Sequence, residues 1–313
     1  MMRLDGDARD PEHLRGGVVA LGNFDGFHRG HQAVVGRAIE RARAEGRPAI
    51  VATFDPHPAR LFHPEAPPFL LSTIAQRLRW FAAAGAYAAY VIAFDMAVAR
   101  SEPEEFVVNY LVERLGAVGA VTGADFTFGR DRSGDGEALA TIGARHGLVG
   151  EAVAAIRDAG GPVSSSRVRR ALTAGDPREA TRLLTRPFTI EGPVDHGAQM
   201  GRKLGFPTAN LHLGEYRRPA YGVYAVRARL ADTAPLDGVA NLGIRPMFDP
   251  PIELLEAHLF DFTGDLYGQV IEVELIDFLR PEWSLPDLAA LRRQIAADCD
   301  AARSRLAASP GAL

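Results

Sequence analysis

The sequence predicts an α/β domain with a parallel sheet and flanking helices, followed by an antiparallel β-barrel domain with a C-terminal helix. From about residue 16 to residue 186, short apolar runs alternate with amphipathic helical segments, which is typical of a parallel sheet with helices on both faces. From Pro187 onward, apolar and charged residues alternate along strands separated by turns, which indicates a small barrel. The 313 residues suffice for two cores, and we place the domains at 16–186 and 187–308.

The composition is that of an ordinary globular chain, with 47% hydrophobic and 24% charged residues. A net charge of −4 gives no reason to expect nucleic acid as a partner. The start, MMRLDGDARDPEH, lacks the apolar core of a secretory signal, and no uncharged run approaches the roughly 20 residues of a membrane span. The single cysteine, Cys299, is expected to be a core thiol. We therefore expect a cytoplasmic protein that binds small molecules and no membrane, with its oligomeric state open.

Within the first domain, apolar spacing between Val34 and Ala42 predicts the first helix, with Gly46 as its stop. Polar segments follow three of the predicted strands: GNFDGFHRGH after the first, DPHP after the second and GADFTFGRDRSGD after the fourth. Because ligands of such folds bind beyond the carboxyl ends of the strands, we expect one site at this edge. The predicted strands are Val18–Leu21, Ala49–Phe54, Tyr90–Phe94 and Ala117–Thr122.

Two histidines, His28 and His31, stand three residues apart where the first helix begins. Residues at this spacing share a helix face, and the free N–H groups of a helix N-terminus favour anions. Two imidazole donors added there would suit a phosphate that gains charge in a transition state, and Gly30 removes side-chain bulk between them. Two structural histidines at a helix cap are the alternative interpretation.

A second hydroxyl- and arginine-rich segment, SSSRVR, opens another predicted helix with Ser164, Ser165, Ser166 and Arg167. Hydroxyls, backbone N–H groups and a guanidinium fork would suit a polyphosphate, although the serines could simply cap the helix. A Walker-A loop is excluded, since the only lysine, Lys203, is followed by leucine.

In the second domain, Thr208 and Asn210 of GRKLGFPTAN lie two apart on an extended segment and should face the same side. A hydroxyl and an amide oxygen are suitable ligands for Mg²⁺ bound to ATP phosphates. At the end of the chain, apolar residues from Leu288 to Leu306 predict one packing face of a helix that opens at Asp287.

These motifs together resemble those of the bacterial bifunctional riboflavin kinase/FAD synthetases, which join an HxGH nucleotidyltransferase domain to a riboflavin kinase domain. The likeness rests on GxFDGxHxGH, TFDPHP, GADFTFG, SSxRVR and GxxxGxPTAN, and spans roughly Gly16 to Leu306. It implies that ATP phosphorylates riboflavin to FMN and that a further ATP adenylylates FMN to FAD, with release of pyrophosphate. The implied small molecules are riboflavin, FMN, FAD, ATP and Mg²⁺.

The resemblance also implies roles for individual residues. In the first domain, His28 and His31 would be catalytic, the ATP contacts would be Gly22, Asn23, Phe24, Asp25, Gly30, Ser164, Ser165, Ser166 and Arg167, and the flavin contacts would be His57, Asp125, Phe126 and Phe128. In the second domain, Glu256 would be the general base, the ATP contacts would be Gly201, Lys203, Gly205, Pro207, Thr208 and Asn210, the Mg²⁺ ligands would be Thr208 and Asn210, and the flavin contacts would be Asn241 and Arg280.

Some positions leave questions open. Thr127 stands where many relatives carry arginine, so a flavin-phosphate contact would be either weaker here or supplied by Arg130 or Arg132. Met247 stands where threonine is common, which leaves one hydroxyl contact open but not the reaction. On sequence grounds alone Glu253 rivals Glu256 as the base. Two other functions are an adenylyltransferase without kinase activity and a flavin-binding sensor, and the intact PTAN run and Glu256 count against both.

Overall fold

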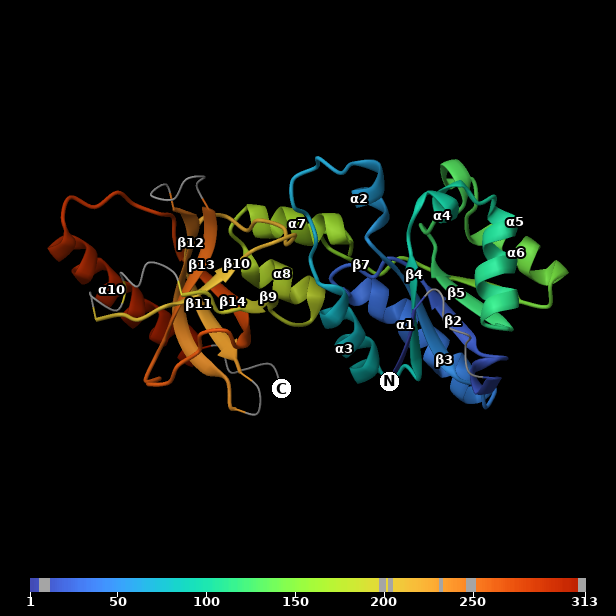
Figure 1. Ribbon diagram of the computed structural model, residues 1–313, viewed down its shortest axis with the longest axis horizontal. Coiled ribbons are helices and arrows are strands. Elements are labelled where there is room, and N and C mark those ends of the chain that lie inside the picture. The colour runs from blue at the N-terminus through green and yellow to red at the C-terminus, as the bar shows by residue number, and fades with distance from the viewer. Residues whose placement is uncertain (6–11, 197–200, 202–204, 231–232, 246–251, 309–313) are drawn as a thin grey trace. The chain divides into compact units, whose positions relative to one another are not determined.

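The computed structural model describes residues 1–5, 12–196, 201, 205–230, 233–245 and 252–308, and it contains two compact units (Figure 1). The first unit comprises Met1–Pro67 and Ser72–Ser164, and the second comprises Pro68–Leu71 and Ser165–Leu313. The domain boundary expected at residue 186 stays a prediction. By packing, the helices on 165–184 belong to the second unit.

The first unit is built on a six-stranded parallel sheet with the strand order β1-β4-β3-β2-β5-β6. The predicted parallel sheet is confirmed, and the four predicted strands correspond to β2 to β5. The outermost strands, β1 and β6, were not predicted. The strands are β1 (Met2–Asp5), β2 (Val18–Leu21), β3 (Ala49–Asp55), β4 (Ala88–Ala93), β5 (Gly119–Gly123) and β6 (Val149–Val153).

Helices cover both faces of this sheet because alternate strand residues enter two different cores. Val18 and Ala20 pack with α1 and α3, whereas Val19 and Leu21 pack with the segment around Phe106. The helices of this unit are α1 (Arg29–Ala44), α2 (Pro58–Phe62), α3 (Ile74–Ala84), α4 (Met96–Arg100), α5 (Pro103–Phe106), the π-helical η2 (Val107–Arg114) and α6 (Gly136–Arg145).

The sheet places the three polar segments on neighbouring strands. β2 lies between β3 and β5, so the loops that follow these strands leave the same edge of the sheet side by side. The chain runs outward in one direction from β2 through β3 to β4 and in the other direction through β5 to β6. The loop after β2 therefore lies at the point where the strand order reverses, which is the usual ligand position in such folds.

The second unit contains a six-stranded antiparallel sheet with the order β10-β13-β12-β11-β14-β9. A bridge between Asp195, just after β9, and Asn210 of β10 brings the two ends of the sheet together, so the barrel is nearly closed and the predicted architecture is confirmed. The strands are β9 (Phe188–Pro193), β10 (Ala209–His212), β11 (Gly222–Arg229), β12 (Leu236–Arg245), β13 (Ile252–Leu259) and β14 (Val270–Arg280).

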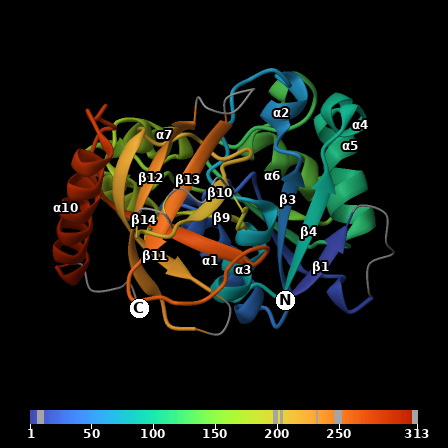
Figure 2. The same cartoon turned by 60° about the vertical axis from the view of Figure 1, so that its left-hand side comes forward.

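Within the described residues, the helices of the second unit with assigned bounds are α7 (Ser165–Thr173), α8 (Pro177–Leu184) and α10 (Leu288–Ala307). α10 begins where the Asp287 side chain accepts the Ala290 N–H, and it lies along the outside of the barrel (Figure 2). Cys299 and Leu306 are buried against the barrel as expected, but Leu288 is 65% exposed, so the predicted packing face does not extend to the first turn. No helix among the described residues has the length and apolar character needed to cross a membrane.

Candidate functional site

The two histidines of the β2–α1 loop form one compact group. His28 is the N-cap of α1, and its Nδ1 accepts the N–H groups of Gly30 (3.2 Å) and His31 (3.4 Å). The two imidazole rings stack with their centroids 3.6 Å apart and their planes 21° apart. Since Nδ1 is an acceptor, the proton of neutral His28 is assigned to Nε2. The capping and the phosphate-binding interpretations therefore concern different nitrogen atoms of one ring.

Small and aromatic residues fix the shape of this loop. The buried Phe24 ring meets His31 edge-on, with 5.4 Å between centroids, and also contacts Phe81. A Cβ at Gly30 would lie 3.1 Å from the His28 ring, which is why glycine suits this position. Phe24 has the left-handed φ of 52°, a conformation that persists only where the surroundings enforce it. Phe24 thus packs between His31 and the core residue Phe81.

A buried arginine that was not predicted from the sequence holds the loop from the sheet side. Nη1 of Arg77, on α3, donates to the carbonyl oxygens of Asn23 (2.8 Å) and Phe54 (3.3 Å) and to the Thr53 hydroxyl (3.1 Å). Burial lowers the pKa of Arg77, although Asp25 acts in the opposite direction. Arg77 thereby joins the ends of β2 and β3.

Asp25 and Asn23, both predicted to shape the ATP loop, differ in their surroundings. The Asp25 carboxylate is buried and accepts the N–H (3.1 Å) and the hydroxyl (3.2 Å) of Ser72, whose Oγ in turn accepts the Gly26 N–H. Asp25 therefore secures the turn. Asn23 Oδ1 is buried and has no hydrogen-bond partner among the described residues, so it can accept a hydrogen bond from a ligand.

The predicted flavin contacts lie beyond β3 and β5. His57 is the N-cap of α2, and its Nδ1 accepts the Ala59 N–H at 3.1 Å. Phe128 is buried in the core, whereas the ring of Phe126, stacked on it at 6.0 Å between centroids, is only partly buried. Phe126 is thus the more accessible ring of the two. Asp125 is the second residue after β5.

The two arginines near Thr127 have different partners. Arg132 Nε donates to the Thr127 hydroxyl at 2.8 Å, so a guanidinium lies next to the position where relatives carry arginine. Arg130 instead pairs with Glu102. Of the two arginines considered from the sequence, Arg132 is the one beside Thr127.

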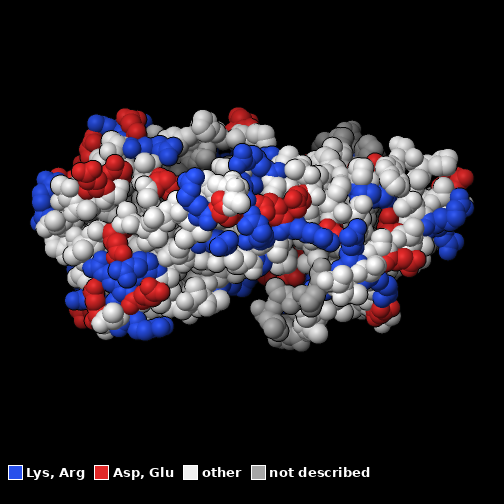
Figure 3. Space-filling model, turned by 180° about the vertical axis from the view of Figure 1, so that it is seen from behind, with Lys and Arg blue, Asp and Glu red and all other residues white. Residues whose placement is uncertain are grey.

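The SSSRVR segment belongs to the second unit from Ser165 onward and begins α7. Arg167 forms an ion pair with Glu179 of α8 at 2.7 Å, and Glu179 also binds Arg182. These two arginines lower the pKa of Glu179. Figure 3 shows Lys and Arg side chains interspersed with Asp and Glu side chains on the face in view. The predicted phosphate ligand Arg167 is therefore engaged in an ion pair in the described structure.

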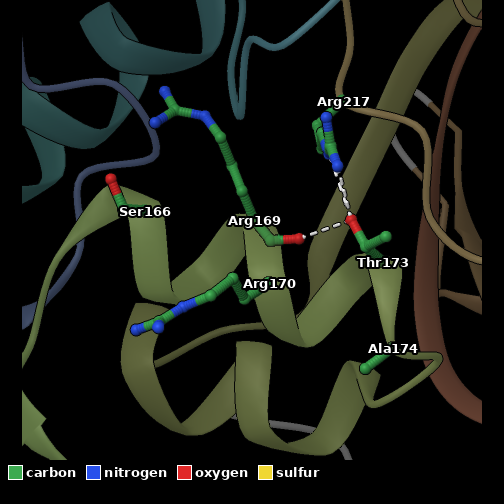
Figure 4. A pocket seen from close by; sticks show the side chains of 6 residues that line it. All are labelled: Ser166, Arg169, Arg170, Thr173, Ala174 and Arg217. Carbon is green, nitrogen blue, oxygen red and sulfur yellow. Dashed lines mark hydrogen bonds between the residues drawn. The ribbon is translucent and has the colours of Figure 1, made fainter.

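A hollow of about 430 Å³ lies beside α7 and is lined by arginine and hydroxyl side chains. Figure 4 shows Arg169 and Arg170 extending away from Arg217, which contacts Thr173. The Arg217 Nη2 donates to the Thr173 hydroxyl at 2.7 Å, and Arg169 Nε donates to the Phe69 carbonyl at 2.8 Å. The guanidinium groups do not converge on one point, so this hollow lacks the geometry of a tight anion site.

In the barrel, strand register gathers three predicted residues. Glu256 of β13 lies directly opposite Asn210 of β10 on one side and Asn241 of β12 on the other. Residues directly opposite each other in a sheet share a face, so the carboxylate stands between two amides. Both amide oxygens, Asn210 Oδ1 and Asn241 Oδ1, are buried without a hydrogen-bond partner among the residues that the structure describes. Such unsatisfied acceptors are expected where a ligand or metal binds.

The Glu256 carboxylate is itself held by Arg245 of β12, whose Nε and Nη2 both donate to Oε2. Burial acts to lower the pKa of Arg245, but the hydrogen bonds to Glu256 and Glu282 raise it overall. The rival base, Glu253, is occupied elsewhere, since it accepts Arg218 Nε at 2.7 Å and the Tyr221 hydroxyl. The two glutamates thus differ in their partners, and Arg245 and Glu282, which were not among the predicted site residues, contact Glu256 and Asn241 respectively.

The remaining kinase residues are placed in part. Phe206 N–H donates to the Gly201 carbonyl at 2.8 Å, and a Cβ at Gly201 would lie 3.3 Å from Thr208 Oγ1. Gly205 and Pro207 are exposed. Lys203 and Met247 lie outside the described residues. Arg280 makes two hydrogen bonds to Asp298, of 2.8 and 2.6 Å.

Comparisons with known proteins agree with this arrangement. The FAD synthetase family model matches residues 10–167, and the riboflavin kinase family model matches residues 184–306. A bifunctional riboflavin kinase/FMN adenylyltransferase from Pseudomonas fluorescens is 42% identical over 300 residues, covering 96% of each chain. The protein of that name from Escherichia coli K12 is 38% identical over 283 residues, covering 90% of each chain.

One solved structure resembles the chain over most of its length. It is described as a macrolide-efflux protein from Streptococcus pneumoniae, and it covers 97% of this chain and 99% of its own with a TM-score of 0.84 and 31% identity. The two-domain architecture is thus shared with a chain of nearly equal extent.

Proposed function

The chain belongs to the bifunctional riboflavin kinase/FMN adenylyltransferase family, and we propose that the residues around His28 and Glu256 carry its two reactions. The enzyme transfers the γ-phosphoryl group of ATP to riboflavin, giving FMN, and then transfers the adenylyl group of a second ATP to FMN, giving FAD and pyrophosphate. Its substrates are accordingly riboflavin, FMN and ATP. We propose the assignment of each reaction to particular residues from the contacts described above.

In adenylyl transfer, an FMN phosphate oxygen attacks the α-phosphorus of ATP and pyrophosphate leaves, with no covalent enzyme intermediate. His28, through Nε2–H, and His31 donate to the α- and β-phosphate oxygens as these gain charge. The stacked rings at the N-terminus of α1 support this role. We assign the pyrophosphate portion of ATP to Ser164, Ser165, Ser166 and Arg167, and the ATP loop to Gly22, Asn23, Phe24, Asp25 and Gly30.

FMN is bound beyond the ends of β3 and β5 in this proposal. Phe126 offers the accessible ring for the isoalloxazine, with Phe128 packed beneath it, and His57 and Asp125 complete this side. Arg132, next to Thr127, supplies the positive charge for the FMN phosphate. The single observation supporting this last step is the 2.8 Å contact between these two side chains.

In the kinase reaction, Glu256 takes the proton from the riboflavin 5′-hydroxyl as that oxygen attacks the γ-phosphorus, and ADP leaves. The observation that carries this assignment is the register that sets Glu256 between Asn210 and Asn241. We assign Asn241 and Arg280 as the riboflavin contacts. The buried Oδ1 of Asn241 can accept a hydrogen bond from riboflavin. Gly201, Lys203, Gly205 and Pro207 are assigned to ATP.

Mg²⁺ fits the oxygen atoms offered here. Asn210 Oδ1 is buried, unpaired within the described residues and a hard oxygen donor, and Thr208 precedes it by two positions. No cluster of three or more His, Cys, Asp or Glu side chains suited to a metal occurs in the described part of the chain, so the ATP phosphates would complete the coordination. Bound there by Thr208 and Asn210, Mg²⁺ would neutralise phosphate charge.

A chromatographic time course of riboflavin with Mg²⁺ and ATP tests these assignments. The parent enzyme should form FMN and then FAD, and Glu256→Gln should form FAD only from added FMN. His31→Ala should accumulate FMN. Glu253→Gln is the matched control and should keep both rates, because Glu253 is bound to Arg218 and Tyr221. Riboflavin phosphorylation by Glu256→Gln at the parental rate would refute the role of Glu256. Location in the cytoplasm and the absence of nucleic-acid partners stay predictions.

A further inference from the structure

The carboxylate of Glu256 is fixed by only one of its two oxygen atoms. Arg245 Nε donates to Oε2 at 2.8 Å and Nη2 donates to the same oxygen, while Oε1 has no partner among the described residues. The Arg245 side chain is 16% exposed and that of Glu256 is 30% exposed. The ion pair therefore leaves one carboxylate oxygen available on the face that it shares with Asn210 and Asn241.

A second carboxylate holds Arg245 in turn. Glu282 Oε1 accepts Arg245 Nη1 at 3.3 Å and Asn241 Nδ2 at 3.0 Å. A Cβ at Gly243 would overlap this carboxylate, so glycine is what allows Glu282 to approach β12. Glu282 comes from the segment after β14 and lies 26 positions beyond Glu256 in the chain, and Arg245 joins the two side chains.

We propose that Arg245 and Glu282 are positioning residues for phosphoryl transfer to riboflavin. Arg245 occupies Glu256 Oε2 and thereby directs Oε1 at the riboflavin hydroxyl, and Glu282 fixes Arg245 and the Asn241 amide together. This inference rests on the proposed role of Glu256 as the base. The physical reason is that a base gains rate from fixed orientation, and an arginine with several donors holds a carboxylate in one geometry where a lysine does not.

Simple stabilisation of the barrel is the competing explanation. The same barrel offers a matched pair for comparison, because Arg229 Nε of β11 donates to Glu274 Oε1 of β14 at 2.6 Å. That pair also joins neighbouring strands, but neither of its residues is near Glu256 in the register of the sheet. Both pairs are partly buried, so breaking either one is expected to destabilise the barrel to a similar degree. A loss of kcat in the Arg245 variants that is absent from the Arg229 control would therefore not come from stability.

The experiment measures kcat and KM for riboflavin phosphorylation by the full chain, together with FMN adenylylation by the same preparations. The variants are Arg245→Met, Arg245→Lys, Glu282→Gln, Glu256→Gln and the control Arg229→Met. We expect Arg245→Met to lower kcat about 100-fold, the scale of a small misplacement of a reacting group. Arg245→Lys should restore part of this loss, to about tenfold below the parent. Glu282→Gln should lower kcat less, and Arg229→Met should match the parent.

The remaining readouts separate positioning from folding. KM for riboflavin should stay within about twofold in the Arg245 variants, because Arg245 acts through Glu256 and is not proposed to bind riboflavin itself. FMN adenylylation by the same preparations should be unchanged. Parental or increased kcat in Arg245→Met would overturn the proposal, as would equal losses of both activities or a loss of the same size in Arg229→Met. Full kinase activity in Glu256→Gln would refute the base itself. Inactive Glu256→Gln together with normal Arg245 and Glu282 variants would refute only the positioning role.

Discussion

Replacing His28 by asparagine would separate the functions of the two nitrogen atoms of one imidazole. Nδ1 accepts the N–H groups of Gly30 and His31 at the start of α1. Asparagine is among the best N-cap residues, so its side-chain oxygen should take over this task. What asparagine cannot supply is the Nε2–H that we assign to the ATP phosphates. His28→Ala removes both functions and completes the comparison.

The structure sets different magnitudes for the two losses. The capping bonds, at 3.2 and 3.4 Å, are long, so we expect His28→Ala to cost about 1 kcal/mol of stability, which lowers the unfolding temperature of a domain of this size by about 2–4 °C. His28→Asn should unfold within about 1 °C of the parent. Loss of one donor to a developing charge lowers kcat by about 100- to 1,000-fold, and both variants should show this decrease in FMN adenylylation.

The assay combines thermal unfolding, hydrogen exchange at the Gly30 and His31 amides, and initial rates of both reactions. Riboflavin phosphorylation by the same chain serves as the internal control and should be unchanged in both variants. If His28→Asn adenylylates FMN at the parental rate, His28 is a capping residue only and the reasoning is refuted. If His28→Ala exchanges its first-turn amides no faster than the parent, the capping contribution is refuted instead.

Three further outcomes follow from buried and paired groups. Arg77→Met should raise the KM for ATP in adenylylation about tenfold without changing riboflavin phosphorylation, since it releases the loop below the histidines; parental adenylylation kinetics would contradict this. Burial and the hydrogen bond to Glu253 raise the pKa of Tyr221 to about 12. The folded chain thus keeps a proton that the unfolded chain loses near pH 10, so this contribution to stability is complete below pH 10 and falls as the pH rises to about 12. The free energy of unfolding in urea should fall less from pH 9 to pH 11 for Tyr221→Phe than for the parent. Equal decreases in the two proteins would count against the raised pKa of Tyr221. Asp298→Ala leaves Arg280 without its carboxylate, and urea unfolding should show a loss of about 3 kcal/mol; a loss below about 0.5 kcal/mol would show that the pair contributes no more than a surface contact.

The central strands of the first unit could be predicted because they are buried on both faces. β2 is fully buried along its four residues and appears in the sequence as a continuous apolar run. β1 and β6 lie at the two edges of the sheet, and β6 has no fully buried residue. Edge strands do not need an apolar run, so neither hydrophobicity nor periodicity marked them.

Residues of the candidate sites could be predicted where they belong to one local motif. They could not be predicted where two contacting residues are far apart in the sequence. His28 and His31 lie within one helical turn, so their shared face follows from spacing alone. The contact between Arg77 and Asn23 joins residues 54 positions apart, and the one between Arg245 and Glu282 joins residues 37 positions apart. Such pairs depend on packing and strand register, for which a single sequence contains no signal.

The alignment of Asn210, Glu256 and Asn241 across three strands also limits how the chain can change length. Side chains of a strand alternate between its two faces, so inserting or deleting one residue within β10, β12 or β13 would turn one of these groups to the opposite side of the barrel wall. A two-residue change would preserve the face but move the group by about 7 Å along the strand. Insertions and deletions in this part of the gene are therefore tolerable only in the connections between strands, whereas substitutions within the strands leave the alignment intact.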